Sequence, residues 1–196
     1  MSVEESLIAR GLWPVCGIDE AGRGPLAGPV VAAAVIMEPD HELRLMVRDS
    51  KQLTEARRES LYELITTSES IQVGVSFIDP STIDSINILQ ATLLAMREAL
   101  LNLPSVPQYA LVDGNSAPDL PCKCITVVKG DRTEPSISAA SIVAKVVRDR
   151  YMDSMEALYP GYGFIRHKGY PTKAHYEAIR TLGACPIHRR SFKGVC

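Results

Sequence analysis

Apolar segments of strand length that end in acidic residues constrain the fold of this chain more than any other sequence feature. The segments are VCGIDE with Asp19 and Glu20, YALVD with Asp113, and KCITVVKGD with Asp131. In α/β proteins, ligand chemistry gathers where strands end, because rigid backbone there aims side chains into a crevice. Four such carboxylates would repel one another without a cation, and oxygen ligands select hard divalent ions such as Mg²⁺ or Mn²⁺. Each acid alone could simply begin a turn, but the four together predict a metal site.

The hydrophobic pattern predicts a single α/β domain over residues 1–196. We expect strands at 15–19, 29–37, 71–78, 109–113 and 123–131, and helices at 3–10, 55–67, 87–100, 134–158 and 172–182. Loops are expected at 38–53 and 161–172. No internal repeat or linker separates these elements, so one mixed α/β domain is the simplest arrangement. Residues from about 160 to 196 are expected to form a C-terminal appendage of basic loop, helix and tail.

Charge is distributed unevenly along the chain. The net charge of -2 and the isoelectric point near 6.1 argue weakly against general electrostatic binding of nucleic acid. From Lys145 onward, however, the sequence holds ten of its 21 Lys and Arg residues and only four of its 23 Asp and Glu residues. The C-terminal quarter could therefore face a polyanion while the remainder does not.

Cysteine usage and the N-terminal sequence favour the cytoplasm. The five cysteines are scattered and odd in number, which is unlike a disulfide framework. The first residues, MSVEESLIARGLW, contain two early glutamates and lack the apolar core of a signal peptide. No apolar run reaches the roughly 18 residues of a membrane span. We therefore expect a cytoplasmic protein that does not act on a membrane.

Further polar motifs could contact phosphate or sugar. Gly22-Arg23-Gly24 follows the acidic pair, where glycines expose backbone N–H groups and the arginine offers a fork for phosphate. Lys168 and Tyr170 share a loop that would suit a sugar or base stacked on the ring beside a phosphate. Lys51 lies in a polar loop and Lys145 on a predicted helix. Each motif alone could equally be a tight turn, an ordinary surface loop or a solvated face.

Two other chemistries lack their sequence signatures. Cys122 and Cys124 have no second Cys or His pair to complete a zinc site. No Gly-x-Ser-x-Gly nucleophile elbow is present, which argues against serine hydrolase chemistry.

Long blocks of the sequence, taken in order, carry a resemblance to a known family. The blocks are GIDEAGRGPLAGPVVAAAVI (17–36), DSKQLTEARRESLYE (49–63), NILQATLLAM (87–96), VDGN (112–115), KGD (129–131), ISAASIVAKVVRDRYM (137–152), YGFIRHKGYPT (162–172) and HRRSF (188–192). Over roughly residues 14–193 the chain resembles ribonuclease HII, the type 2 ribonuclease H of bacteria. The chain ends soon after the last block, so we expect none of the C-terminal extension with which other members make extra contacts.

The resemblance implies a ribonuclease-H-like fold, in which helices flank a central mixed sheet, and a metal-dependent endoribonuclease activity. The RNA strand of RNA–DNA hybrids would be hydrolysed, and duplex DNA would be nicked 5′ to single embedded ribonucleotides, leaving 3′-hydroxyl and 5′-phosphate ends. Two Mg²⁺ or Mn²⁺ ions would take part. The resemblance assigns them the ligands Asp19, Glu20, Asp113 and Asp131.

The resemblance also implies how substrate is recognised. Backbone groups of Gly22, Arg23 and Gly24 would read the ribonucleotide 2′-OH, and Tyr170 would pack on the sugar of the following deoxynucleotide. Phosphates would be held by Lys51, Lys145 and Lys168. RNA–DNA hybrid and ribonucleotide-containing duplex are the expected partners, and we expect a monomer without an obligate protein partner.

Two alternatives come from other function classes. One is a metal-dependent nuclease or phosphatase with another substrate, which the basic appendage and Tyr170 disfavour for small substrates. The other is a non-catalytic module that binds hybrids, which gains nothing from carboxylates that repel phosphate. A panel of nucleic acids and a metal titration would separate these alternatives.

Overall fold

Five strands form a mixed sheet at the centre of the computed structural model, which describes residues 1–47 and 54–195. The strands are β1 (Val15–Ala21), β2 (Val30–Met37), β3 (Ile71–Ile78), β4 (Tyr109–Asp113) and β5 (Lys123–Val127), in the spatial order β3-β2-β1-β4-β5. β2 pairs antiparallel with both β1 and β3. β4 pairs parallel with both β1 and β5. The central strand β1 therefore joins an antiparallel half of the sheet to a parallel half.

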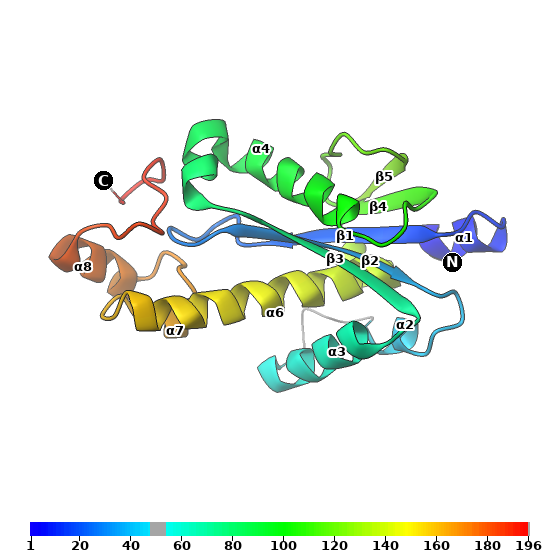
Figure 1. Cartoon of the computed structure of the whole chain (residues 1–196), viewed down its shortest axis with the longest axis horizontal. Coiled ribbons are helices and arrows are strands. Elements are labelled where there is room, and N and C mark those ends of the chain that lie inside the picture. Colours follow the sequence, from blue (N-terminus) through cyan, green and yellow to red (C-terminus); the bar gives the residue numbers. More distant parts are fainter. Residues whose placement is uncertain (48–53, 196) are drawn as a thin grey trace.

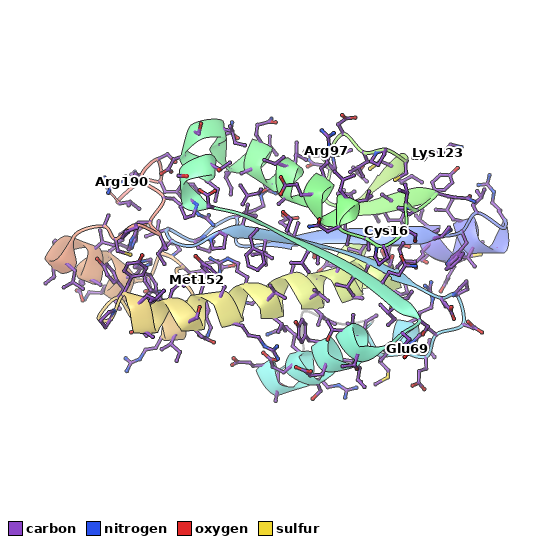
Figure 2. All side chains as sticks on the ribbon, in the orientation of Figure 1. Cys16, Glu69, Arg97, Lys123, Met152 and Arg190 are labelled. Carbon is purple, nitrogen blue, oxygen red and sulfur yellow. The ribbon has the colours of Figure 1, made fainter. Side chains whose placement is uncertain are left out.

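Helices cover both faces of this sheet (Figure 1). α4 (Pro80–Leu101) lies over one face, and α6 (Pro135–Leu158) and α3 (Glu55–Thr67) lie against the other. Side chains alternate between faces along a strand, so Cys16 belongs to the core under α4 (Figure 2), whereas Ala33 and Val35 belong to the core under α6. All eight residues of β2 are buried, which explains why its sequence is continuously apolar.

Shorter helices lie at the ends of the sheet. These are α1 (Val3–Ala9), α2 (Leu43–Met46), α5 (Gly130–Thr133), α7 (Phe164–His167) and α8 (Lys173–Leu182). α8 and the tail lie at the end of the molecule opposite α1 (Figure 1). The appendage has an apolar cluster of its own, in which Met152 of α6 (Figure 2) packs with Phe164, Ile179 and Ile187. The predicted appendage is therefore anchored to the long helix α6.

The fourth helix is longer than predicted and contains a break. It begins at Pro80, and Asn87 within it adopts the non-helical angles φ 67° and ψ 164°. The Asn87 Oδ1 accepts hydrogen bonds from the N–H groups of Leu89 and Gln90, at 3.0 and 3.2 Å. Asn87 thus caps the start of the segment that the sequence predicted, and the preceding turns were missed.

Three further expectations were wrong in detail. The region 38–53 contains the short helix α2, and the region 161–172 contains α7. The strand predicted to run to Asp131 ends at Val127, because Lys129 takes a left-handed conformation with φ 60° and the chain then enters α5. Asp131 therefore lies on a helical turn, not at the end of a strand.

Among the described residues, no helix is long and apolar enough to cross a membrane. Within the same part of the chain, the free cysteines are Cys16, Cys122, Cys124 and Cys185.

Candidate active site

Asp19 and Asp113 come from neighbouring parallel strands and point to the same face of the sheet. Ile18 of β1 pairs with Val112 of β4, and both side chains belong to the core under α4. The next residue on each strand therefore points to the opposite face, toward α6. Asp19 is only 6% exposed, and its Oδ1 accepts a hydrogen bond from the Glu20 backbone N–H at 2.7 Å. The register of β1 and β4 thus places two of the predicted ligands on one side of the sheet.

Asp131 approaches Asp113 from α5 and is completely buried. The Asp113 Oδ1 accepts hydrogen bonds from the backbone N–H groups of Gly130 and Asp131, at 2.7 and 3.5 Å. The Ser138 hydroxyl donates to the Asp131 carbonyl at 2.6 Å. These contacts fix α5 between the end of β4 and the start of α6.

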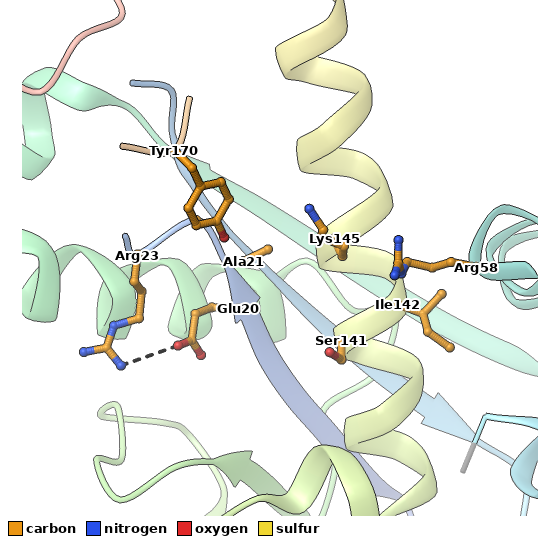
Figure 3. A pocket seen from close by; sticks show the side chains of 9 residues that line it. Glu20, Ala21, Arg23, Arg58, Ser141, Ile142, Lys145 and Tyr170 are labelled. Atoms are coloured by element: carbon orange, nitrogen blue, oxygen red, sulfur yellow. Dashed lines mark ion pairs between the residues drawn. The ribbon is translucent and has the colours of Figure 1, made fainter. Parts of the chain in front are cut away.

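Glu20 points away from Asp19 along the strand and faces Arg23 instead. Its Oε1 lies 3.5 Å from an Arg23 guanidinium nitrogen (Figure 3). Glu20, Asp113 and Asn115 also line a small hollow of about 80 Å³. All four predicted carboxylates consequently lie around the C-terminal ends of β1 and β4.

Burial and nearby negative charge raise the pKa values of Asp19 and Glu20. For Asp19, burial is the largest cause of a pKa well above the usual range, and the charges of Glu20 and Asp113 raise it further. A hydrogen bond with Ser141 acts in the opposite direction. Burial also raises the pKa of Glu20, although Arg23 opposes this. The cluster therefore carries its negative charge at a free-energy cost that a nearby cation would offset.

The donor chemistry of this corner fits a hard divalent cation, since every predicted ligand is a carboxylate. Among residues 1–47 and 54–195, however, no three His, Cys, Asp or Glu side chains are grouped so that they could hold a metal ion. In this arrangement Glu20 faces Arg23, and Asp113 accepts a hydrogen bond from the backbone of α5. The structure thus gathers the four acids around one corner of the sheet, and their joint coordination of a cation stays a prediction.

A pocket of about 360 Å³ opens beside Glu20 (Figure 3). It is lined by Glu20, Ala21, Gly22, Arg23, Arg58, Ser141, Ile142, Lys145 and Tyr170. A Cβ atom placed on Gly24 would lie 3.7 Å from a ring carbon of Tyr170, so the Gly22–Gly24 turn and this ring are neighbours. Tyr170 is 40% exposed, which leaves its ring accessible to a ligand.

The predicted phosphate-binding lysines differ in their placement. Lys145 lines the pocket, and its Nζ lies 2.7 Å from Asp149 Oδ1 one turn further along α6. Lys168 does not line this pocket, and its Nζ pairs with Asp153. Lys51 lies outside the described residues.

Two arginines of the basic C-terminal quarter, which the sequence suggested could face a polyanion, are instead buried. Arg148 is 1% exposed and Arg189 is 0% exposed. Arg148 follows Ala140 and Ala144 at four-residue spacing on α6, and all three lie on its buried stripe. That spacing was the sequence signal for its burial. Sequence reasoning gave no comparable signal for Ser141 and Arg58, which also line the pocket.

Solved structures share this fold. The structure superposes on the ribonuclease H2 from Pyrococcus horikoshii OT3 with a TM-score of 0.77 and 30% identity, covering 92% of this chain and 94% of that chain. A second match is a structure of the PCNA:RNase HII complex from Archaeoglobus fulgidus, with a TM-score of 0.78, 28% identity and coverage of 92% and 96%. The predicted ribonuclease-H-like fold is confirmed. Fold and carboxylate corner together define a ribonuclease H, a class of metal-dependent endonucleases.

Sequence comparison narrows this class to one family. Residues 16–195 match the family described as Ribonuclease HII. The ribonuclease HII of Geobacter sulfurreducens is 54% identical over 192 residues, covering 98% of this chain and 88% of the relative. That of Polynucleobacter necessarius is 53% identical over 188 residues, covering 94% of each. The chain belongs to the ribonuclease HII family and is an endoribonuclease that acts on RNA–DNA hybrids.

Proposed function

We propose that this enzyme nicks duplex DNA on the 5′ side of single embedded ribonucleotides, in addition to cutting longer hybrids, and leaves 3′-hydroxyl and 5′-phosphate ends. One observation carries the proposal. The turn Gly22–Gly24, which is separated from the Asp19–Glu20 pair by one residue, lies against the exposed ring of Tyr170 in a pocket beside Glu20. Carboxylates and a sugar-sized recognition surface thus adjoin each other.

Asp19, Glu20, Asp113 and Asp131 would hold the divalent ions. When bound, such ions supply an activated water and stabilise the leaving oxygen of a phosphodiester. The chain's own residues need no nucleophile of their own: their task is to fix the ions beside the pocket. The rigid ends of β1 and β4 suit that task, because strand backbone holds a carboxylate more precisely than a loop does.

Selection of a ribonucleotide requires a group that detects the 2′-OH, since this hydroxyl distinguishes RNA from DNA at one position. Backbone groups of Gly22, Arg23 and Gly24 are next to the catalytic acids and would make this contact. Tyr170 would pack on the sugar of the following nucleotide, where a 2′-OH would clash. The Gly22–Gly24 turn and Tyr170 face the same pocket, which supports a joint role in recognising the ribonucleotide.

Lys145 would bind a substrate phosphate at the edge of the pocket. Its pair with Asp149 is partly exposed, and ion pairs of this kind contribute little free energy, so a phosphate can compete for the lysine. Lys168 would contribute at longer range, because Asp153 already partners it. Lys51 would also bind a substrate phosphate, as the sequence predicts.

The choice between Mg²⁺ and Mn²⁺ belongs to this proposal, as do a cytoplasmic location and action as a monomer. A structure of Bst-RNase HIII in complex with Mn²⁺ has the same fold, with a TM-score of 0.74 and 21% identity. For this chain, the acids present oxygen donors that suit either ion. We therefore treat both ions as candidates.

The test is incubation with a labelled DNA duplex carrying one ribonucleotide, in Mg²⁺, in Mn²⁺ and in chelator. We expect one metal-dependent nick on the 5′ side of the ribonucleotide and none in the matched all-DNA duplex. Tyr170→Ala should reduce cleavage at the single ribonucleotide more than it reduces affinity for the duplex. Cutting confined to long hybrids would remove the Tyr170 role, and absence of cutting with either ion would refute the catalytic proposal.

A further inference from the structure

Two buried arginines stand behind the pocket and bind backbone carbonyl groups. Arg148 of α6 and Arg189 of the C-terminal tail are almost fully removed from solvent. Arg148 donates to the carbonyls of Ala27, Pro29 and Lys168, at 3.0 to 3.1 Å. Buried cations are normally paired with carboxylates, because desolvation of an isolated charge is costly. Here neutral carbonyl dipoles take that place.

Arg189 forms hydrogen bonds with the Gly22–Gly24 turn, which is called the reading turn below because it is proposed to contact the 2′-OH. Its Nη2 donates to the Gly22 carbonyl at 2.6 Å, and its Nη1 donates to the Arg23 carbonyl at 3.1 Å. Its Nε donates to the carbonyl of Gly28 at 2.9 Å, at the far end of the same loop. The planar guanidinium therefore donates hydrogen bonds to three carbonyls of the loop. A lysine ammonium does not present donors in this planar arrangement.

These contacts decide where the N–H groups of the turn point. In a trans peptide, the carbonyl of one residue and the N–H of the next point in opposite directions. Since Arg189 draws the Gly22 and Arg23 carbonyls inward, the N–H groups of Arg23 and Gly24 point away from it. Neither N–H donates a hydrogen bond to any residue in the described part of the chain. Two oriented donors are thus available to a ligand beside Glu20.

Arg148 fixes the second side of the same surface. Its guanidinium lies 5.8 Å from the centre of the Tyr170 ring, and it also holds the Lys168 carbonyl two residues before that ring. A Cβ atom on Gly22 would lie 2.1 Å from Arg148 Nε, so only glycine fits at this turn. The two arginines therefore connect the turn, the Tyr170 loop and the tail.

We propose that Arg189 is a positioning residue for ribonucleotide recognition, which orients the Arg23 and Gly24 N–H groups toward the substrate 2′ oxygen. The inference rests on the proposed function, in which the turn reads that hydroxyl. Arg189 does not touch substrate, because it is completely buried. In the described part of the chain, the hydrogen-bond acceptors of the Arg189 side chain are carbonyl groups, and its positive charge lies beneath a site that receives a polyanion. Burial and the charge of Arg148 lower its pKa, which a bound phosphodiester would oppose.

The experiment compares Arg189→Lys with Arg190→Lys. Arg190 is the exposed neighbour on the tail (Figure 2), and its hydrogen bond to Asp84 uses the backbone N–H, which the substitution leaves in place. Both variants keep the positive charge, but only Arg189→Lys removes the three guanidinium hydrogen bonds to the loop. The measurements are kcat and KM for nicking at one ribonucleotide, affinity for the all-DNA duplex in chelator, and the thermal midpoint.

We expect Arg189→Lys to lower kcat/KM at the ribonucleotide on the order of 10-fold to 100-fold, as for a misplaced recognition group. Its affinity for the all-DNA duplex should match wild type, and Arg190→Lys should match wild type in both assays. Wild-type kcat/KM in Arg189→Lys, or a loss equal to its loss of all-DNA affinity, would overturn the inference. A wild-type enzyme that does not nick the ribonucleotide would instead refute the proposed function.

If Arg189→Lys fails to fold, Arg189→Ala supplies the second test. Guanidinium ion at a non-denaturing concentration can occupy the vacated site and restore the carbonyl contacts. Recovery of kcat/KM at guanidinium concentrations that leave the thermal midpoint of the variant unchanged supports positioning. Recovery of kcat/KM only in proportion to recovery of the thermal midpoint would show that Arg189 only stabilises the fold.

Discussion

At the scale of single residues, Asp19 lowers the stability of the folded protein at the carboxylate site to which it belongs. Its side chain is buried, and its pKa is raised by that burial and by the charges of Glu20 and Asp113. Such a group destabilises the folded protein whenever it is ionised without a cation. The same arrangement makes the site attractive to a divalent ion, because ion binding removes the repulsion.

This reasoning predicts that Asp19→Asn abolishes cleavage but stabilises the metal-free protein. We expect unchanged hybrid affinity in chelator and a free energy of unfolding higher by about 1–2 kcal/mol. Urea unfolding at pH 7, in chelator and then in Mn²⁺, measures this, and the ion should stabilise only the wild type. Asp119→Asn is the control, since that side chain is 94% exposed. A less stable Asp19→Asn protein in chelator would contradict the argument.

At the scale of elements, the site depends on how closely α6 approaches β1. A Cβ atom on Gly17 would lie 2.1 Å from the carbonyl carbon of Ser136, so the helix start rests directly on the strand. This contact sets the distance between Asp19 on the strand and Ser141 on the helix. Close packing here is therefore a requirement of the site as well as of the core.

Gly17→Ala should consequently separate β1 from α6 and destabilise the protein by about 2–4 kcal/mol, because backbone cannot move aside as a flexible side chain can. Gly24→Ala is the matched comparison, since its Cβ would meet only Tyr170 at an ordinary 3.7 Å. Thermal unfolding of both variants distinguishes them. Equal thermal midpoints would show that the strand and helix are not in tight contact.

The sequence predicted most elements of this fold, and its failures share a physical cause. The β1 and β4 patterns and the acids that end them follow from local hydrophobicity. Asn87 and Lys129 were not predictable in this way, because their positive φ angles depend on caps and neighbours that hydrophobic periodicity does not indicate. Asp131 was consequently placed on the correct corner but on the wrong element.

The buried arginines show the other limit of sequence reasoning. A cluster of basic residues predicts a surface that meets a polyanion, since cations are rarely buried. Arg148 and Arg189 depart from this pattern because most of their acceptors are carbonyls of the segment 22–29, more than 100 residues away in the chain. A pattern of side-chain types contains no record of where backbone carbonyls point.

At the scale of the whole molecule, the appendage makes stability depend on pH. The His188 Nε2 lies 3.1 Å from the His175 Nε2, so one nitrogen must donate and the other accept. Burial, with the neighbouring His175, lowers the pKa of His188 to about 4, against 6.5 in the unfolded chain. Between these values the unfolded chain binds a proton that the folded protein refuses, so stability falls as the pH drops from 6.5 toward 4.

We therefore expect the free energy of unfolding to fall between pH 7 and pH 5 by up to about 2 kcal/mol more in the wild type than in His188→Gln. Glutamine keeps a donor for His175 but does not titrate. Urea unfolding of both proteins at the two pH values gives this difference, and the subtraction removes the contribution of the carboxylates. Equal losses in the two proteins would exclude His188 as the titrating group.

The hydrogen bonds between Arg189 and the loop from Gly22 to Gly28 also join segments that are translated at different times. The partners are separated by 161 to 167 residues of chain. At about 5–20 residues per second, the loop leaves the ribosome roughly 10–30 s before its guanidinium partner is made. Strand β1 and its acids are therefore made well before the residue that orders the proposed reading turn. A growing chain would acquire the proposed recognition surface only after Arg189 has been made.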